Sequence, residues 1–449
     1  MPEGDAAMDE DTQGPGRVIG FRACLALVVG NLIGSGIYLL PANLAPLGWN
    51  GAVGWVVTIG GALCIAHVFA RLCAHLPAAG GPYAYTRAAF GHLTAFFVAW
   101  AYWIFVWLGN AAIAVAVVSA LSVFAPAVSQ VPGLPAVLAV ALVWAVTFVN
   151  IVGIGAASRV QIVTVLLKLL PLVAVIAISA VVLLTRGADI AANVAPVPLG
   201  VGAISGAVAL SFWGFVGLES ATVPAAKIRD PRRTIPRATM IGVVLTGVVY
   251  ILVSTAITVL MPHAEAAASP APVAAFIAIY WGSAAGSLVA LFAAISAAGA
   301  LNGYVLVQGE VAQAMAVGGV FPRWMAPANA AGSPARAHVV SSLLLTIVTL
   351  MNFNRSLSNL FEFIALVSIA TGLMAYLACA AAALKLIPHE RALWFTAPLA
   401  AAFAVWAIYG CGLVTLAWGL VLVALGVPVY LWVLLVEKPG AVGGTAGAT

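Results

Sequence analysis

The stretch that decides the fold is GNLIGSGIYLLP, residues 30–41, in which three glycines surround Asn31 and Ser35 inside a long apolar run. A second stretch, SFWGFVGLES at residues 211–220, places two glycines just before Glu219. Glycine weakens a helix interior, although small residues also allow close helix packing, which is the alternative interpretation. A helix that unwinds halfway across a bilayer leaves peptide groups without partners, unless they line a cavity or hold a ligand. The paired stretches therefore predict two interrupted membrane helices that meet at a binding site.

The composition supports a membrane location. Of the 449 residues, 64% are hydrophobic and only 7% are charged, against about a quarter in soluble domains. Apolar runs of about 20 residues, long enough to cross a bilayer, recur along nearly the whole chain. They are rich in Ala, Val, Leu and Gly and do not alternate with polar residues, which argues against a β-barrel. The predicted fold class is therefore an all-α polytopic membrane protein.

Twelve segments are predicted to cross the membrane. A polar tail over residues 1–16, without a signal-peptide pattern, is expected to precede them, and a second tail over 437–449 to follow. The predicted spans are 17–46, 51–75, 92–124, 134–153, 157–184, 201–226, 237–261, 273–315, 337–353, 358–386, 392–412 and 414–436.

The basic residues predict the orientation. Because cytoplasmic loops carry an excess of Lys and Arg, the side with more of them is expected to face the cytoplasm. Only Arg186 and Arg355 fall on the other side. Both termini are thus predicted to be cytoplasmic, in a bacterial inner membrane. The fifteen residues placed on the cytoplasmic side are Arg17, Arg22, Arg71, Arg87, Arg159, Lys227, Arg229, Arg232, Arg233, Arg237, Arg323, Arg336, Lys385, Arg391 and Lys438.

Ionisable residues inside predicted spans cost about 2.5 to 3.5 kcal/mol each and need a partner or a purpose, and four of them stand out as candidates. Lys168 has two interpretations: it releases and recovers a proton during transport, or it is a fixed ammonium that ties its helix to freed carbonyls near Gly34. Glu219 is expected to pair with an aromatic or hydroxyl group as a gate, with a buried protonated carboxyl as the alternative. Glu310 and Glu362 lie nearer span ends and are expected to serve contacts between helices.

Polar and aromatic side chains near the middle of the spans are further candidates. Asn110 offers donors and an acceptor in an apolar stretch, and a bond between helices is the usual role of such an Asn. Aromatic rings can stack on a cationic ligand or obstruct its path, although many membrane Trp residues are interfacial anchors. The aromatic candidates are Tyr102, Trp103, Trp107, Trp213 and Tyr304.

Covalent catalysis is not expected. The six histidines are scattered near span ends, the five cysteines show no paired spacing, and no phosphate-binding loop is present. We therefore expect no metal, no cofactor and no nucleic acid partner. The expected partners are a small-molecule substrate and the lipid bilayer, and a substrate-sensing receptor stays an alternative.

Several motifs resemble those of a known family. From about residue 18 to 436 the chain resembles the amino acid/polyamine/organocation (APC) superfamily, most closely its bacterial basic amino acid/polyamine antiporters. The resemblance implies the inverted-repeat fold of the leucine transporter type, with one repeat at 17–184, the second at 201–386, and two more helices at 392–436. A homodimer is also expected from it. The matching stretches are GNLIGSGIYLLPANLA, AAGGPYAYTRAAFG, YWIFVWLGN, FVNIVG with SRVQ, WGFVGLESATVPAAKIRDPRRTIPRAT and VGGVFP.

The resemblance also implies the site residues. The substrate's carboxylate and amino groups are expected to lie against the two interrupted helices, and its side chain against three other helices. Two gates are expected to close the site. The residues for the polar groups are Leu32, Ser35, Gly36 and Val216; those for the side chain are Phe105, Val106, Asn110, Tyr304 and Ser368; Trp213 is also expected to contact the substrate. The outward-side gate is expected at Trp213 and the inward-side gate at Tyr102, Glu219 and Tyr376, and Tyr304 is a further gating candidate.

The implied activity is exchange of a basic amino acid, such as arginine, for its decarboxylated amine, such as agmatine. The sequence departs from the arginine/agmatine exchangers of the family. Tyr304 replaces a Trp, and Phe105 and Val106 replace smaller residues. Lys168 has a counterpart in proton-coupled symporters of the superfamily, where the ammonium takes the place of sodium. The alternative is therefore a proton-coupled symporter or exporter of neutral amino acids.

Overall fold

The structure is a computed structural model, and it describes residues 20–76, 81–152, 158–185, 189–219, 228–352 and 354–437. Of residues 158–167 it describes the backbone only. The topology predictions for Arg17, Arg159, Arg186, Lys227 and Lys438, and for most of both tails, lie outside the described side chains.

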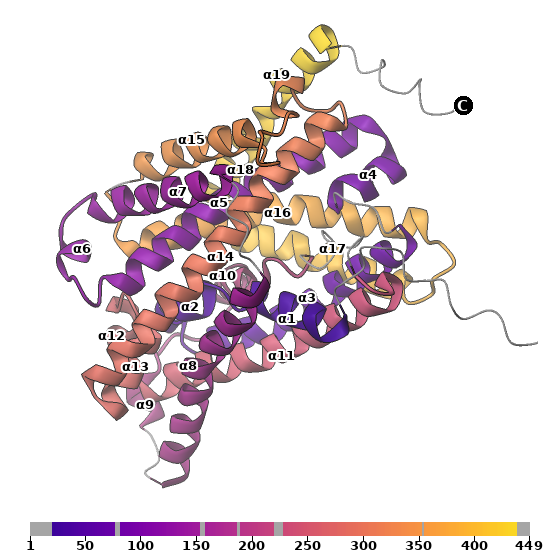
Figure 1. The fold of residues 1–449 in the computed structure, drawn as a ribbon. Helices are drawn as coiled ribbons and strands as arrows, with labels where there is room; N and C mark the ends of the chain where they lie inside the picture. The colour runs from indigo at the N-terminus through magenta and orange to yellow at the C-terminus, as the bar shows by residue number, and fades with distance from the viewer. Residues whose placement is uncertain are drawn as a thin grey trace, which may run out of the picture.

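Helices make up most of the described chain, as the composition predicts (Figure 1). They are α1 (Phe21–Leu32), α2 (Gly36–Leu44), η1 (Ala45–Leu47), α3 (Trp49–His75), α4 (Pro82–Phe90), α5 (His92–Leu121), α6 (Ala127–Gln130), α7 (Leu134–Val152), α8 (Ser158–Thr185), α9 (Ile190–Asn193), α10 (Val201–Phe212), η2 (Trp213–Phe215), α11 (Pro231–Leu260), α12 (His263–Ala268), α13 (Pro272–Trp281), α14 (Ser283–Val317), η5 (Arg323–Met325), α15 (Ala335–Met351), α16 (Leu357–Leu386), α17 (Leu393–Gly410), α18 (Leu413–Ala424), α19 (Gly426–Trp432) and η6 (Val433–Glu437).

The helices are long and apolar enough for a multi-pass membrane protein. Within the described ranges, ten helical segments reach the length and hydropathy of a membrane span. Two shorter apolar segments, Val201–Phe215 and Ala335–Met351, coincide with the sixth and ninth predicted spans. Each predicted span thus has a helical counterpart, while the total of twelve crossings stays a prediction.

The prediction that residues 273–315 form one continuous span is wrong. Residues 273–315 form two helices, α13 and α14, instead of one. The chain turns at Gly282, whose φ of +87° lies in the left-handed region that glycine adopts without strain. The run is also about twice as long as a bilayer requires, a length that fits one crossing plus a shorter helix.

Helix α5 forms the centre of the bundle. In its most apolar window 94% of the residues are buried, against 17% for the last span, Leu413–Val436. It packs most extensively against α16 and α14. A helix that is hydrophobic all round is stable in such a central position, because it has no polar face to turn toward water. Residues on α5 therefore lie in the middle of the helix bundle.

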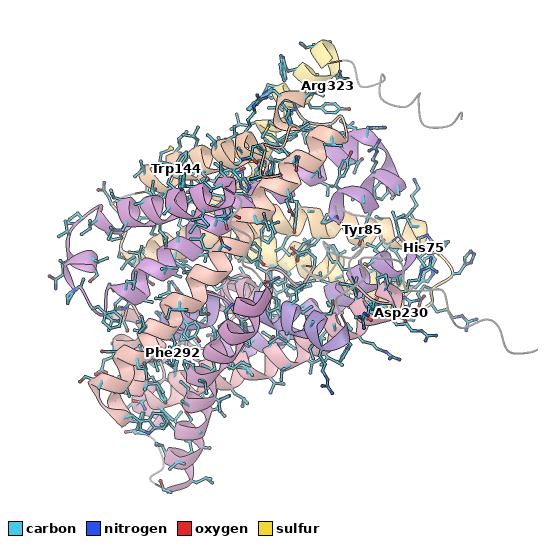
Figure 2. The ribbon with its side chains drawn as sticks, viewed as in Figure 1. His75, Tyr85, Trp144, Asp230, Phe292 and Arg323 are labelled. Atoms are coloured by element: carbon cyan, nitrogen blue, oxygen red, sulfur yellow. The ribbon has the colours of Figure 1, made fainter. Side chains whose placement is uncertain are left out.

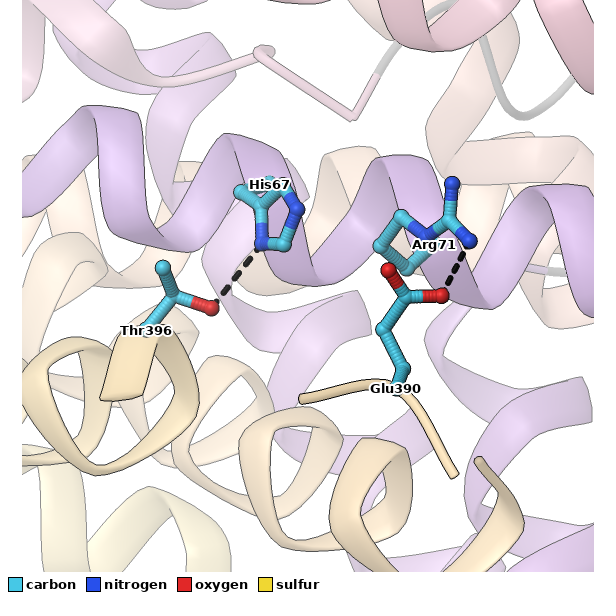
Figure 3. A network of polar contacts seen from close by, with 4 residues as sticks. All are labelled: His67, Arg71, Glu390 and Thr396. Atoms are coloured by element: carbon cyan, nitrogen blue, oxygen red, sulfur yellow. Dashed lines mark hydrogen bonds and ion pairs between the residues drawn. The ribbon is translucent and has the colours of Figure 1, made fainter. Parts of the chain in front are cut away.

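Polar contacts fasten α17 to α3 at one end of the bundle. Arg71 on α3 forms an ion pair with Glu390, and one turn away His67 Nδ1 lies 2.9 Å from the Thr396 hydroxyl (Figure 3). His75 and Asp230 lie at the same end (Figure 2). Arg71 near the end of α3, and Arg232 and Arg233 in the first turn of α11, are basic residues predicted to be cytoplasmic, and they lie at this end of the bundle.

Candidate functional site

The first glycine stretch interrupts a helix as the sequence predicts. Helix α1 ends at Leu32, and α2 begins at Gly36. Two carbonyls freed by the interruption accept hydrogen bonds from side chains. The Lys168 ammonium donates to the Gly30 carbonyl at 2.9 Å, and the Tyr250 hydroxyl donates to the Leu32 carbonyl at 2.6 Å. The unwound backbone is therefore held by groups from α8 and α11, as a buried polar backbone requires.

The second stretch leaves helical geometry at the end of η2. Val216 is extended, with φ −60° and ψ 127°, and Gly217 has φ +95°. The Tyr304 hydroxyl on α14 donates to the Val216 carbonyl at 3.2 Å. A Cβ at Gly217 would lie 1.9 Å from that hydroxyl, so glycine is needed both for the backbone and for the space. The described part of this segment ends at Glu219.

A small cavity lies between the two interruptions. Its volume is about 20 Å³, close to the space that one water needs, so an amino acid enters only if the walls move. Helices α2 and α10 lie beside each other in the middle of the bundle and contact one another (Figure 1). The lining residues are Asn31, Leu32, Gly34, Ser35, Gly36, Ile113, Trp213, Val216, Ala300 and Tyr304.

The Trp213 side chain lines the cavity on the side predicted to face outward. The Trp213 ring packs edge-on against Phe361 of α16, with ring centroids 5.7 Å apart and planes at 85°. It also lies over the start of α2, because a Cβ at Gly36 would approach Trp213 Cδ1 to 2.7 Å. The absence of a side chain at Gly36 therefore makes room for the ring.

A buried carboxyl group, that of Glu219, lies on the side predicted to face the cytoplasm and outside the cavity lining. Glu219 is only 1% exposed, and its two oxygens accept from Tyr102 Oη of α5 at 2.8 Å and from Tyr376 Oη of α16 at 2.5 Å. Hydrogen bonds to a carboxylate are stronger than bonds between neutral groups. The pairing of Glu219 with aromatic hydroxyls agrees with the predicted geometry, and its gating role stays a prediction.

The structure divides the predicted substrate residues into two groups. Six line the cavity: Leu32, Ser35, Gly36, Trp213, Val216 and Tyr304. The other four are buried and lie outside this lining: Phe105, Val106, Asn110 and Ser368.

The second group is engaged in contacts between helices. The Ser368 hydroxyl donates to the Phe105 carbonyl at 2.8 Å, and Asn110 Nδ2 donates to Gln308 Oε1 at 2.7 Å. A substrate reaches Asn110 and Ser368 only after the cavity has widened. Their predicted roles, and those of the first group, stay predictions.

Several neighbours of the cavity carried no prediction. Asn31 belongs to the decisive glycine stretch, Ile113 follows Asn110 by three residues, and Ala300 precedes Tyr304 by four. Helical spacing places such residues on the same face, so a signal was present in the sequence. The apolar side chains of Ile113 and Ala300 give no chemical reason to select them, whereas the carboxamide of Asn31 does.

The remaining ionisable candidates have structural partners. Lys168 forms the tie to a freed carbonyl that one of its two interpretations describes, and its role with protons stays a prediction. Glu362 accepts from Asn43 Nδ2 of α2 at 3.1 Å, which is a contact between helices. Glu310 lies exposed on α14. Among the described residues, no group of three or more His, Cys, Asp or Glu side chains is placed to hold a metal.

Comparison with known proteins identifies the family. The family model described as amino acid permease matches residues 19–436. The chain belongs to the amino acid permease family. The resemblance to APC transporters seen in its motifs is thereby confirmed, and the interrupted helices around a central cavity are the corresponding structural feature.

Individual relatives are antiporters or transporters of cationic solutes by name. A cadaverine/lysine antiporter of Escherichia coli is 35% identical over 344 residues, which is 74% of this permease and 76% of the relative. A putative arginine/ornithine antiporter of Bacillus subtilis is 28% identical and covers 82% of this chain and 84% of its own. A putrescine transporter of Haemophilus influenzae is 26% identical, covering 92% and 96%.

Proposed function

We propose that this permease exchanges a basic amino acid for the amine formed by its decarboxylation. The observation that carries the proposal is the cavity between two helix interruptions, walled by bare peptide groups and the Tyr304 ring. Both exchanged molecules carry an ammonium and a cationic end, and they differ in the carboxylate. The sequence similarity to antiporters of cationic amino acids and diamines supports the same exchange.

The two ends of a basic amino acid find different partners in this geometry. The N-terminus of α2 at Gly36 presents unpaired backbone N–H groups and a positive dipole end, which suit a carboxylate. The Tyr304 ring suits a cationic end, and such a contact in a desolvated pocket contributes about 2 kcal/mol. An amine without the carboxylate keeps only the second contact, so one site accepts both molecules.

Two substrate pairs follow from this proposal. Lysine with cadaverine is favoured by the 35% identity to the E. coli antiporter. Arginine with agmatine, the pair expected from the motifs, is favoured by a flat aromatic face in the cavity wall, on which a guanidinium stacks. Proteoliposomes loaded with each candidate and given radiolabelled lysine or arginine outside separate the two pairs by the rate of counterflow.

The second candidate function is proton-coupled symport of neutral amino acids. It is favoured by the absence of charged side chains from the cavity lining and by the Lys168 ammonium beside the first interruption. Uptake that needs internal substrate supports exchange, whereas uptake into empty vesicles under an inward proton gradient supports symport. Lys168→Ala is expected to abolish only the second behaviour. If no cationic ligand competes in either assay, the exchange proposal is wrong.

We also propose that both chain ends face the cytoplasm of a bacterial inner membrane. The asymmetry of basic residues supports this orientation. Reporter fusions to the C-terminus test it, because alkaline phosphatase is active only outside and a fluorescent protein matures only inside. Active phosphatase would reverse the assignment.

A further inference from the structure

A chain of four buried polar side chains crosses the bundle behind the cavity. It consists of Asn110 on α5, Gln308 on α14, Ser342 on α15 and Thr147 on α7, and each of them is 0% exposed. Asn110 Nδ2 donates to Gln308 Oε1 at 2.7 Å, Gln308 Nε2 donates to Ser342 Oγ at 3.1 Å, and Ser342 Oγ lies 2.8 Å from Thr147 Oγ1. We call this set the polar chain.

The polar chain ends one helical turn from the cavity lining. Asn110 precedes the lining residue Ile113 by three residues on α5, and Gln308 follows the lining residue Tyr304 by four on α14. Residues at these spacings share a helix face. The Asn110–Gln308 pair therefore lies one turn beyond Ile113 and Tyr304, on the side of the cavity toward Glu219.

One atom of the polar chain has no partner in the described part of the structure. Asn110 Oδ1 is buried and accepts no hydrogen bond from any group that the structure describes. An unpaired buried acceptor costs about 1 to 3 kcal/mol, so such an atom in a functional region calls for an explanation. A carbonyl oxygen next to the cavity can accept from an ammonium and cannot donate to a carboxylate.

The partner of Asn110 decides which atom of its carboxamide is free. Since Gln308 Oε1 takes the Asn110 amino group, the oxygen of Asn110 is the atom left over. Gln308 is itself held by Ser342, and α14 meets α15 closely there, because a Cβ at Gly309 would lie 2.4 Å from His338 Cε1. If both carboxamides were reversed, Asn110 would present N–H groups instead and would repel an ammonium.

We propose that Gln308 is a positioning residue for substrate selectivity: it orients the Asn110 carboxamide so that Oδ1 is available to the cationic end of the substrate. The inference rests on the proposed exchange of basic substrates and adds the residue that makes the site prefer a cation. Asn110 and Ser342 engage both polar atoms of the Gln308 carboxamide in hydrogen bonds.

Competition binding to the purified permease tests this with lysine and norleucine, which lacks the ε-ammonium. The measured quantity is the ratio of the two dissociation constants. Gln308→Met keeps the side-chain length and removes both hydrogen bonds, so the preference for lysine is expected to fall about tenfold, the value of one hydrogen bond to a charged group. Gln308→Glu retains an oxygen opposite Asn110 Nδ2 and is expected to keep the preference.

Gln313→Met is the matched control. Gln313 lies on the same helix and donates to the Ala326 carbonyl at 2.9 Å, so its substitution also removes a glutamine hydrogen bond. The preference for lysine is expected to stay within about twofold of the original. Should Gln308→Met yield no folded protein, Gln308→Asn, one methylene shorter and out of reach of its partners, is expected to give the same loss.

The outcomes separate this inference from the proposed function. An unchanged preference in Gln308→Met or Gln308→Asn, or equal weakening of both ligands, overturns the positioning role while the exchange proposal stands. If the unsubstituted permease binds lysine no better than norleucine, both proposals fail.

Discussion

The two predicted closures of the cavity differ in chemistry. Toward the predicted cytoplasmic side, two tyrosine hydroxyls donate to one buried carboxylate, Glu219. Toward the predicted outer side, the Trp213 ring packs edge-on against Phe361 over a glycine. The first closure is directional and leaves buried polar groups unpaired when it opens. The second is an apolar ring contact.

This difference predicts unequal costs of opening. Breaking the bonds to Glu219 leaves two buried tyrosine hydroxyls unpaired, which costs free energy unless water enters and pairs with them. Releasing Trp213 loses an aromatic contact worth about 0.5 to 1.5 kcal/mol beyond its buried area. The polar side is therefore expected to control the rate of exchange, and the aromatic side to adjust the balance between conformations.

The largest effect is expected from Glu219→Leu. Two tyrosine hydroxyls lose their acceptor, at about 1 to 3 kcal/mol each, so the closed state on that side is destabilised and exchange falls about 100-fold. Counterflow in proteoliposomes measures the rate. Glu219→Gln, which still offers an oxygen to one tyrosine, is the control and is expected to fall less. Equal rates in Glu219→Leu and the unsubstituted permease would contradict the polar closure.

The native cysteines provide an independent reading of the same variant. Cys379 follows Tyr376 by three residues on α16 and is fully buried. When the polar closure is lost, this thiol is expected to react with a maleimide, and mass spectrometry of the labelled peptide identifies it. Cys411, which is also buried but lies at the end of α17, should stay unlabelled.

An intermediate effect is expected from Gly217→Ala. The new Cβ would lie 1.9 Å from the Tyr304 hydroxyl, and the φ of +95° is strained for alanine. Exchange is expected to fall about tenfold, since a strained backbone of this kind costs 1 to 3 kcal/mol. Gly303→Ala is the matched control, because its Cβ would meet nothing within 4 Å. Removing the hydroxyl with Tyr304→Phe should restore part of the rate, and an unimpaired Gly217→Ala would show that the turn is freely deformable.

The sequence predicted both interruptions because glycine clusters in apolar runs have few stable arrangements. The turn at Gly217 and the end of α1 at Leu32 follow from local chemistry, which is visible in the residues themselves. The turn at Gly282 was missed, although the length of the run around it was a sufficient signal.

The sequence could not predict which residues on different helices form hydrogen bonds with each other. Gln308 lies 198 residues from Asn110, and Tyr250 lies 218 residues from the Leu32 carbonyl that it binds. Helical periodicity gives the face of a residue, whereas the residue opposite depends on how the helices pack. For the same reason the sequence could name Asn110 as polar and unusual, yet could not say which of its atoms is free.

The smallest effect is expected from Phe361→Leu, and it tests the comparison most sharply. Leucine keeps most of the apolar volume and removes the edge-on contact with Trp213, so only the aromatic closure weakens. An equilibrium shift of about 0.5 to 1.5 kcal/mol toward the outward-facing state is expected, seen as an about threefold lower KM for external substrate with nearly unchanged maximal exchange. Phe363→Leu is the control, because its ring lies under Arg355 at 4.3 Å rather than against Trp213. A fall in maximal rate as large as that of Glu219→Leu would mean that the two sides close with equal strength, and the distinction between a polar rate-controlling side and an aromatic balancing side would be wrong.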